Sequence, residues 1–176
     1  MRTAAAWLAG ALLAAPAVAQ DFPPLRAALT GYQEVPSVSS EAFGSFEARV
    51  VGDVFDPAAR VDYTLVYVAL QADVVMAHIH FAQEAVNGPI VVWLCGTPAQ
   101  AGPPGTATCP GRSGVVRGSF TAANVLAAGT QQLAAGELSE LILAMRAGVA
   151  YVNVHSTLSP GGEIRGQVAQ GRYVPR

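Results

Sequence analysis

Three histidines are the residues of this chain whose type and spacing could do chemistry. They are its only histidines in 176 residues, and they fall in two segments, as His78 and His80 and as His155. Side chains alternate across a β-strand, so a His-x-His spacing places His78 and His80 on one side while Ala77 and Ile79 point to the other. Since the apolar set belongs to the core, we expect both imidazoles on the opposite, outward surface.

The segment around His155 follows the same alternation, with Val152 and Val154 inward and His155 outward. If the two segments are neighbouring strands, about 4.8 Å apart, three imidazoles converge on one patch of a rigid sheet. Neutral nitrogens favour copper or zinc over magnesium or calcium, and copper binds more tightly in the usual divalent order. We therefore predict copper on His78, His80 and His155, with zinc as second choice and one coordination position open for water or substrate.

The alternative for the same residues is a set of solvent-facing histidines without a function. A single histidine on an exposed strand is typically of that kind. The third histidine, in matching orientation and on a second strand-like segment, favours the metal site. No acid–base triad is evident around the three residues.

The last hairpin adds a charge to this outward face. Residues 160–162 read Pro-Gly-Gly, a turn signal, so the strands on either side should pair antiparallel. Arg165 then lies beside the open metal position, where it would attract a small anion. Tyr151, Asn153 and Glu163 share the face, and the carboxylate of Glu163 could hold the far nitrogen of a ligating imidazole. The alternative is a Glu163–Arg165 surface pair, worth well under about 1 kcal/mol.

Short strand patterns dominate the rest of the chain, separated by Gly, Pro, Asn and Asp clusters. They predict an all-β fold, an antiparallel Greek-key-like β-sandwich or barrel with one or two short helices late in the chain. The candidate strands are residues 26–35, 44–51, 61–68, 74–81, 89–94, 115–120, 150–155 and 163–168, and the candidate helices are residues 121–128 and 137–147.

Composition excludes several classes of protein. The net charge is −2, and all ten basic residues other than histidine are arginines, so no basic field exists to hold nucleic acid. The apolar fraction of 52% excludes a disordered chain. The length of 176 residues is that of a single domain large enough to bury a hydrophobic core.

Residues 1–19 have the pattern of a signal peptide. Arg2 supplies a positive start, residues 4–15 are small and apolar, and Ala17-Val18-Ala19 is the small-x-small pattern of a cleavage site before Gln20. The apolar run is shorter than the roughly 20 residues needed to span a bilayer, so we predict no membrane span. The mature protein is expected in the periplasm or secreted.

Export affects the interpretation of the two cysteines. Cys95 and Cys109 close a loop rich in Gly, Pro, Ala and Thr. In an oxidising compartment such a pair predicts a disulfide, which would stabilise the fold by about 3 kcal/mol. A metal site on two thiolates is the alternative, but it lacks the Cys-x-x-Cys spacing and a nearby histidine.

From about residue 25 to residue 170 the chain resembles the chordin (CHRD) domain family. The motifs that carry the resemblance are residues 29–36 (LTGYQEVP), 77–80 (AHIH), 87–92 (NGPIVV), 151–155 (YVNVH) and 160–166 (PGGEIRG). The resemblance implies an all-β extracellular domain, which occurs alone in many bacteria and as repeats in animal chordins, the antagonists of secreted growth factors. It does not imply a particular activity.

A weaker likeness is to the copper site of copper–zinc superoxide dismutases, which also have a His-x-His strand, a histidine on a neighbouring strand and an arginine beside the copper. The residues of this chain that correspond to that copper site are His78, His80, His155 and Arg165 alone. The bridging histidine, the zinc ligands and that family's disulfide loop have no counterpart, so the likeness implies a copper-only enzyme. The sequence thus favours an exported copper protein that dismutates superoxide, with Arg165 attracting the anion. The alternatives are a non-catalytic extracellular binding or structural module and a copper or zinc carrier.

Overall fold

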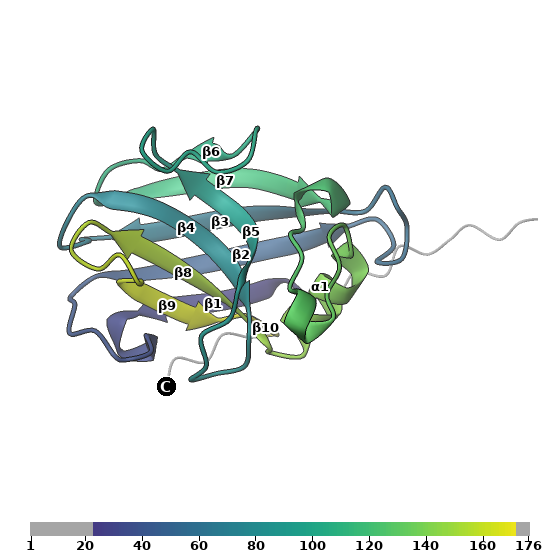
Figure 1. Ribbon diagram of the computed structural model, residues 1–176, viewed down its shortest axis with the longest axis horizontal. Coiled ribbons are helices and arrows are strands. Elements are labelled where there is room, and N and C mark those ends of the chain that lie inside the picture. The colour runs from purple at the N-terminus through teal and green to yellow at the C-terminus, as the bar shows by residue number, and fades with distance from the viewer. Residues whose placement is uncertain (1–22, 172–176) are drawn as a thin grey trace, which may run out of the picture.

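One continuous, mostly antiparallel sheet forms the frame of the protein, as the computed structural model shows for residues 23–171 (Figure 1). The predicted signal peptide, residues 1–19, lies outside this described part. The strands are β1 (Leu25–Thr30), β2 (Phe43–Val51), β3 (Arg60–Val68), β4 (Val74–Phe81), β5 (Ile90–Gly96), β6 (Ala107–Thr108), β7 (Gly114–Thr121), β8 (Ala150–Ser156), β9 (Ile164–Gln167) and β10 (Ala169–Gln170).

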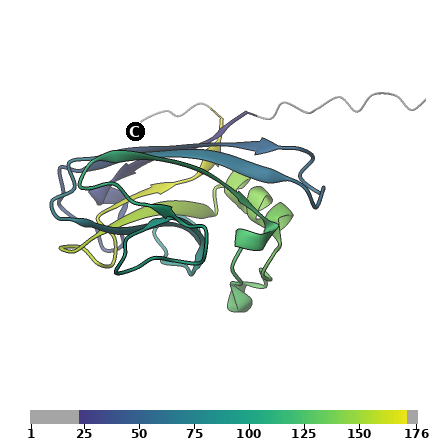
Figure 2. The same cartoon turned by 90° about the horizontal axis from the view of Figure 1, so that it is seen from above.

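The strand order is β6-β5-β4-β8-β9-β1-β2-β3-β7, with β10 paired to β1, and the sheet nearly closes into a barrel. Its two halves lie over one another as layers (Figure 2). Tyr63 of β3 joins them across the interior, because its hydroxyl donates to the Leu94 carbonyl of β5 at 2.7 Å. The all-β prediction is confirmed. No helix in residues 23–171 is long and apolar enough to cross a membrane.

Alternation in the sequence determines which face of each strand is buried. In β3, Val61, Tyr63, Leu65 and Tyr67 point into the core, while the residues between them are partly exposed. β-branched and aromatic residues suit such a half-buried strand. The core lies between the two layers of the sheet.

One α-helix, α1 (Leu138–Arg146), covers one end of the sheet (Figure 1). It falls within the predicted range 137–147 and buries four apolar residues at helical spacing, Leu138, Leu141, Ile142 and Met145. It stops before Gly148, whose φ of +74° is the left-handed conformation that favours glycine at a helix end. The predicted helix over residues 121–128 is reduced to one 3₁₀ turn, Ala122–Asn124.

The strand predicted over residues 26–35 ends at Thr30. A 3₁₀ turn, Gly31–Gln33, follows it, and an irregular connection then leads to β2. A side chain at Gly31 would meet the Val38 carbonyl oxygen at 2.3 Å, so this close turn needs glycine. The connection carries Glu34 to the candidate site described below.

The predicted disulfide is present between Cys95 and Cys109. It closes a loop whose short strand β6 pairs in parallel with β5. Gly102 of this loop packs on Trp93, since a Cβ at Gly102 would lie 2.6 Å from the indole ring. The disulfide loop therefore supports Trp93 from outside.

We expect the disulfide to stabilise the fold by restricting the unfolded chain. A C95A/C109A variant should lose about 3 kcal/mol of unfolding free energy, the value for a loop of this length. Urea unfolding with and without a reducing agent measures the loss in the natural protein, and the double variant is the control that a reductant should leave unchanged. Equal unfolding midpoints for the oxidised, reduced and substituted proteins would contradict this expectation.

Candidate metal centre

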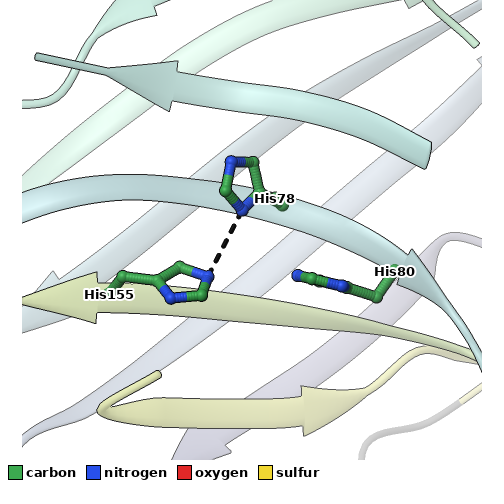
Figure 3. A group of neighbouring side chains, drawn as sticks. All are labelled: His78, His80 and His155. Carbon is green, nitrogen blue, oxygen red and sulfur yellow. Dashed lines mark hydrogen bonds between the residues drawn. The ribbon is translucent and has the colours of Figure 1, made fainter. Parts of the chain in front are cut away.

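The three histidines come together on the side of β4 and β8 that faces away from the hydrophobic core (Figure 3). The two strands are antiparallel neighbours, with Met76 opposite His155 and His78 opposite Asn153. Ile79 is fully buried in the core, so alternation leaves the histidines before and after it on the other side. The imidazoles converge as the alternation predicted.

This side of the sheet is covered, and the prediction of an exposed patch is wrong. His78 is 0% exposed, His155 6% and His80 8%. Trp93 of β5 packs edge-on against the His78 ring, with ring centroids 4.2 Å apart. Tyr151 of β8 stacks on His80 at 4.7 Å with the rings nearly parallel. Alternation assigns a residue to one side of a strand, but it contains no information on what covers that side.

Two backbone carbonyls determine which nitrogen of His80 and His155 carries the proton. His80 Nδ1 donates to the Gly88 carbonyl at 2.9 Å, and His155 Nδ1 donates to the Pro160 carbonyl at 2.9 Å. A carbonyl only accepts, so in both rings Nε2 has the lone pair. His80 Nε2 is buried and has no hydrogen-bond partner among the described residues. Its lone pair is therefore available to a metal ion.

His78 completes the group. Its Nδ1 lies 3.3 Å from His155 Nε2, the contact drawn as a dashed line in Figure 3. Because His155 Nε2 offers only a lone pair, the proton of this contact belongs to His78 Nδ1. A metal ion that took both nitrogens would need the His78 proton on Nε2 instead. The two forms of the site therefore differ in the tautomer of His78.

Burial keeps the imidazoles neutral. It lowers the pKa of His78 to about 2, and repulsion from the other two histidines acts in the same direction. It lowers the pKa of His80 to about 4, with a smaller opposing effect of the hydrogen bond to Gly88. The pKa of His155 is also lowered by burial. Neutral imidazole is the form that binds metal ions.

The geometry of the donors fits a small transition-metal ion. The possible ligand nitrogens all lie within 4.8 Å of one another. Two metal–nitrogen bonds of about 2.0 Å at a tetrahedral angle place the nitrogens about 3.3 Å apart, which matches the His78–His155 separation of 3.3 Å. Nitrogen donors suit zinc and copper better than magnesium or calcium. The cluster could therefore hold a metal ion of the nitrogen-binding class.

The residues predicted around the ligands have different partners. Tyr151 stacks on a histidine, whereas the Asn153 side-chain amide donates to Glu34 Oε1 at 2.7 Å. Glu163 Oε1 accepts from the Ser40 hydroxyl and from a backbone N–H, both at 2.8 Å. The far nitrogens of two histidines are thus held by backbone carbonyls, and not by the Glu163 carboxylate, one of the two roles that the sequence left open for this residue.

Arg165 lies one strand further from the histidines, on β9. It is 1% exposed, and its guanidinium carbon lies 3.4 Å from the centroid of the Tyr151 ring. Tyr151, on the strand between, separates Arg165 from His80. Glu163 is also fully buried, so the surface ion pair considered for Glu163 and Arg165 is wrong.

Sequence reasoning missed Glu34 and Trp93 as neighbours of the site. Glu34 is 6% exposed; burial raises its pKa to about 7, while the Arg165 charge and the Asn153 hydrogen bond act to lower it. The available signal was its place in the motif at residues 29–36. Nothing in the local spacing shows that this segment folds over β8, and the spacing alone predicts a strand that includes Glu34.

Comparison with known proteins identifies a family. A family model described as the CHRD domain matches residues 25–168, most of the chain. No curated protein and no solved structure matches the chain significantly. The matched range contains β1 to β9, and hence all three histidines and every neighbour described above.

We expect the metal-free protein to lose stability as the pH falls below about 6.5. The folded pKa values of His78 and His80, about 2 and about 4, lie below the usual 6.5. The unfolded chain therefore takes up protons that the folded chain does not. Each histidine that stays neutral should remove roughly 1 kcal/mol of folding free energy per pH unit until its folded pKa is reached. Urea unfolding of chelator-treated protein at about pH 7.5 and about pH 5 measures the loss.

The matched control is an H78Q/H80Q variant, in which the two imidazoles are absent and the loss should be smaller. Glu34 acts with the opposite sign, because its pKa is raised to about 7 and its contribution to stability is lost as the pH rises. It is present in both proteins and cancels in the comparison. Equal losses in the two proteins would rule out the histidines as the cause.

Proposed function

We propose that this chain, which belongs to the CHRD domain family, binds one copper ion through His78, His80 and His155. The observation that carries the proposal is the set of three buried, neutral imidazoles with ligand nitrogens within 4.8 Å of one another. Two of these rings have their other nitrogen bound to a carbonyl. Such partners orient a ligand ring and raise its basicity.

Copper is preferred to zinc on the identity of the donors. An all-nitrogen site has its highest divalent affinity for copper in the usual order, and zinc follows. Carboxylates, which would favour harder ions, make other contacts here through one oxygen each, since Glu163 Oε1 accepts from Ser40 and Glu34 Oε1 accepts from Asn153. Availability in the compartment would decide between copper and zinc in the cell.

Within this proposal the reaction is superoxide dismutation. Bound copper supplies one-electron chemistry between its two oxidation states. Overall, one superoxide loses an electron and becomes dioxygen, and a second gains an electron and two protons and becomes hydrogen peroxide. The three imidazoles keep one geometry through both halves because β4 and β8 hold them rigidly. The positive charge of Arg165 favours an anion near the site, although the Tyr151 ring lies between this charge and His80.

The deep burial of the histidines favours a second candidate, the holding of copper or zinc without turnover. His78 is 0% exposed, and a substrate needs a path to the metal that a stored or structural ion does not. A non-catalytic extracellular module would need no metal at all. We also propose export to the periplasm or beyond, with cleavage after Ala19; the Cys95–Cys109 disulfide supports an oxidising compartment.

Copper titration tests the binding step. One Cu(II) per chain should bind with imidazole nitrogen coupling in the EPR spectrum, and it should quench Trp93, whose ring lies 4.2 Å from His78. An H78Q/H155Q variant should lose more than about 100-fold in affinity, because even the loss of a residue that only orients a ligand costs 10–100-fold. E41Q removes an exposed carboxylate and should bind as the natural protein does. Unchanged copper binding by H78Q/H155Q would reject the three-histidine site, and the non-catalytic extracellular module would then be the remaining hypothesis.

A superoxide assay separates the enzyme from the carrier. The copper-loaded chain should remove superoxide faster than the same concentration of free copper, and H80Q should reduce the rate at equal copper loading. Both proteins are assayed after unbound copper has been removed. A rate no greater than that of free copper, at full loading of the site, would reject dismutation and support holding without turnover.

A further inference from the structure

The surroundings of Arg165 are not explained by metal binding alone. This residue lies in the middle of the sheet, paired with Asn153 of β8 on one side and Thr30 of β1 on the other. It is 1% exposed. A charge at this depth is stable only if its N–H groups have partners, so the identity of those partners indicates what the residue does.

The guanidinium donates to one short segment, residues 82–89 between β4 and β5, which we call the covering segment. Nη2 donates to the Gln83 carbonyl at 3.3 Å and the Val86 carbonyl at 2.9 Å, and Nη1 donates to Asn87 Oδ1 at 3.2 Å. These acceptors are spread over five residues of chain. A planar guanidinium can reach all of them at once, which a single ammonium group does much less well.

The same guanidinium is one end of a three-layer stack. Its central carbon lies 3.4 Å from the centroid of the Tyr151 ring. The Tyr151 ring in turn stacks on the His80 ring, with centroids 4.7 Å apart and an angle of 4° between the ring planes. Cation–π and stacking contacts both restrict the orientation of a ring. The orientation of the His80 imidazole is therefore coupled to Arg165 through Tyr151.

The covering segment makes a second connection to the same histidine. At its end, the Gly88 N–H donates to the Tyr151 hydroxyl at 3.2 Å, and the Gly88 carbonyl accepts from His80 Nδ1 at 2.9 Å. A side chain at Gly88 would lie 2.0 Å from the Phe81 carbonyl oxygen, so only glycine lets the segment approach this closely. Arg165 fixes the segment that carries this carbonyl.

We infer that Arg165 is a positioning residue for His80: it holds the covering segment and the Tyr151 ring so that His80 keeps its proton on Nδ1 and directs Nε2 toward the metal. This inference rests on the proposed metal-binding function. It differs from the role expected from the sequence, in which Arg165 attracts the substrate anion directly. An anion at the histidines would meet the Tyr151 ring before the guanidinium.

R165K and R165Q distinguish positioning from attraction by charge. Lysine keeps the charge, but a single ammonium group cannot reproduce the three hydrogen bonds that the planar guanidinium makes to the covering segment. If Arg165 positions His80, both variants should lose about 10–100-fold in copper affinity, and both should shift the His80 imidazole N–H signal in NMR spectra of the metal-free protein and speed its exchange with solvent. Natural copper affinity and an unchanged His80 signal in R165K, with a loss of superoxide rate only in R165Q, would overturn the inference.

Two further variants complete the test. R117Q removes an exposed arginine of β7 and should leave the His80 signal and the copper affinity unchanged. N87A keeps Arg165 but removes one of its acceptors and the bond from Asn87 to the Val35 carbonyl. N87A should shift the His80 signal in the same direction by a smaller amount. If the Arg165 variants do not fold, the response of the His80 signal to N87A tests the positioning role. An unchanged His80 signal in N87A would overturn positioning.

The NMR measurement also separates this inference from the proposed function. If the natural protein binds no copper, the proposed function fails, and the His80 signal of the metal-free variants still reports whether Arg165 orients the ring. If copper binds but the His80 signal does not respond to R165K, R165Q or N87A, the inference fails and the metal site stands.

Discussion

The neutrality of three buried imidazoles is the condition that the surrounding structure satisfies. A charged imidazole in a dry interior is costly, and burial lowers the pKa values of His78 and His80 to about 2 and about 4. A neutral ring still has one N–H that needs an acceptor. The carbonyls of Gly88 and Pro160 meet that need for His80 and His155. A lone pair is left on the opposite nitrogen of each of these two rings, and lone pairs of this kind are what bind metal ions.

The nearly closed sheet holds the site rigidly, and the loops that connect the strands shield it from solvent. An antiparallel sheet commonly leaves one face in water, but here the covering segment and the turn after β8 lie over the polar face of β4 and β8. Hydrogen bonds to the polar groups beneath them must therefore come from within the protein, and His80 Nε2 is a buried atom there that has none among the described residues. The Asn153–Glu34 and Glu163–Ser40 hydrogen bonds are part of this network.

Much of the fold and part of the site could be predicted from local pattern. The strands over residues 61–68 and 74–81 and the helix over residues 137–147 appear in the structure within a residue or so, because their apolar periodicity is strong. The strand over residues 26–35 was predicted too long, since the turn that ends it depends on a close approach between Gly31 and the distant Val38 carbonyl. Local propensity does not contain that contact.

Side-chain alternation, a property of the extended backbone, was enough to place His78 and His80 on one side of a strand and to match His155 to them. It did not reveal that this side is buried, or that the Tyr151 ring stands between Arg165 and His80. Those features arise from contacts between residues about 80 positions apart, such as Arg165 with the covering segment. Only the packed chain brings such residues together, so tertiary structure decided which atoms surround the imidazoles and which nitrogen each leaves free.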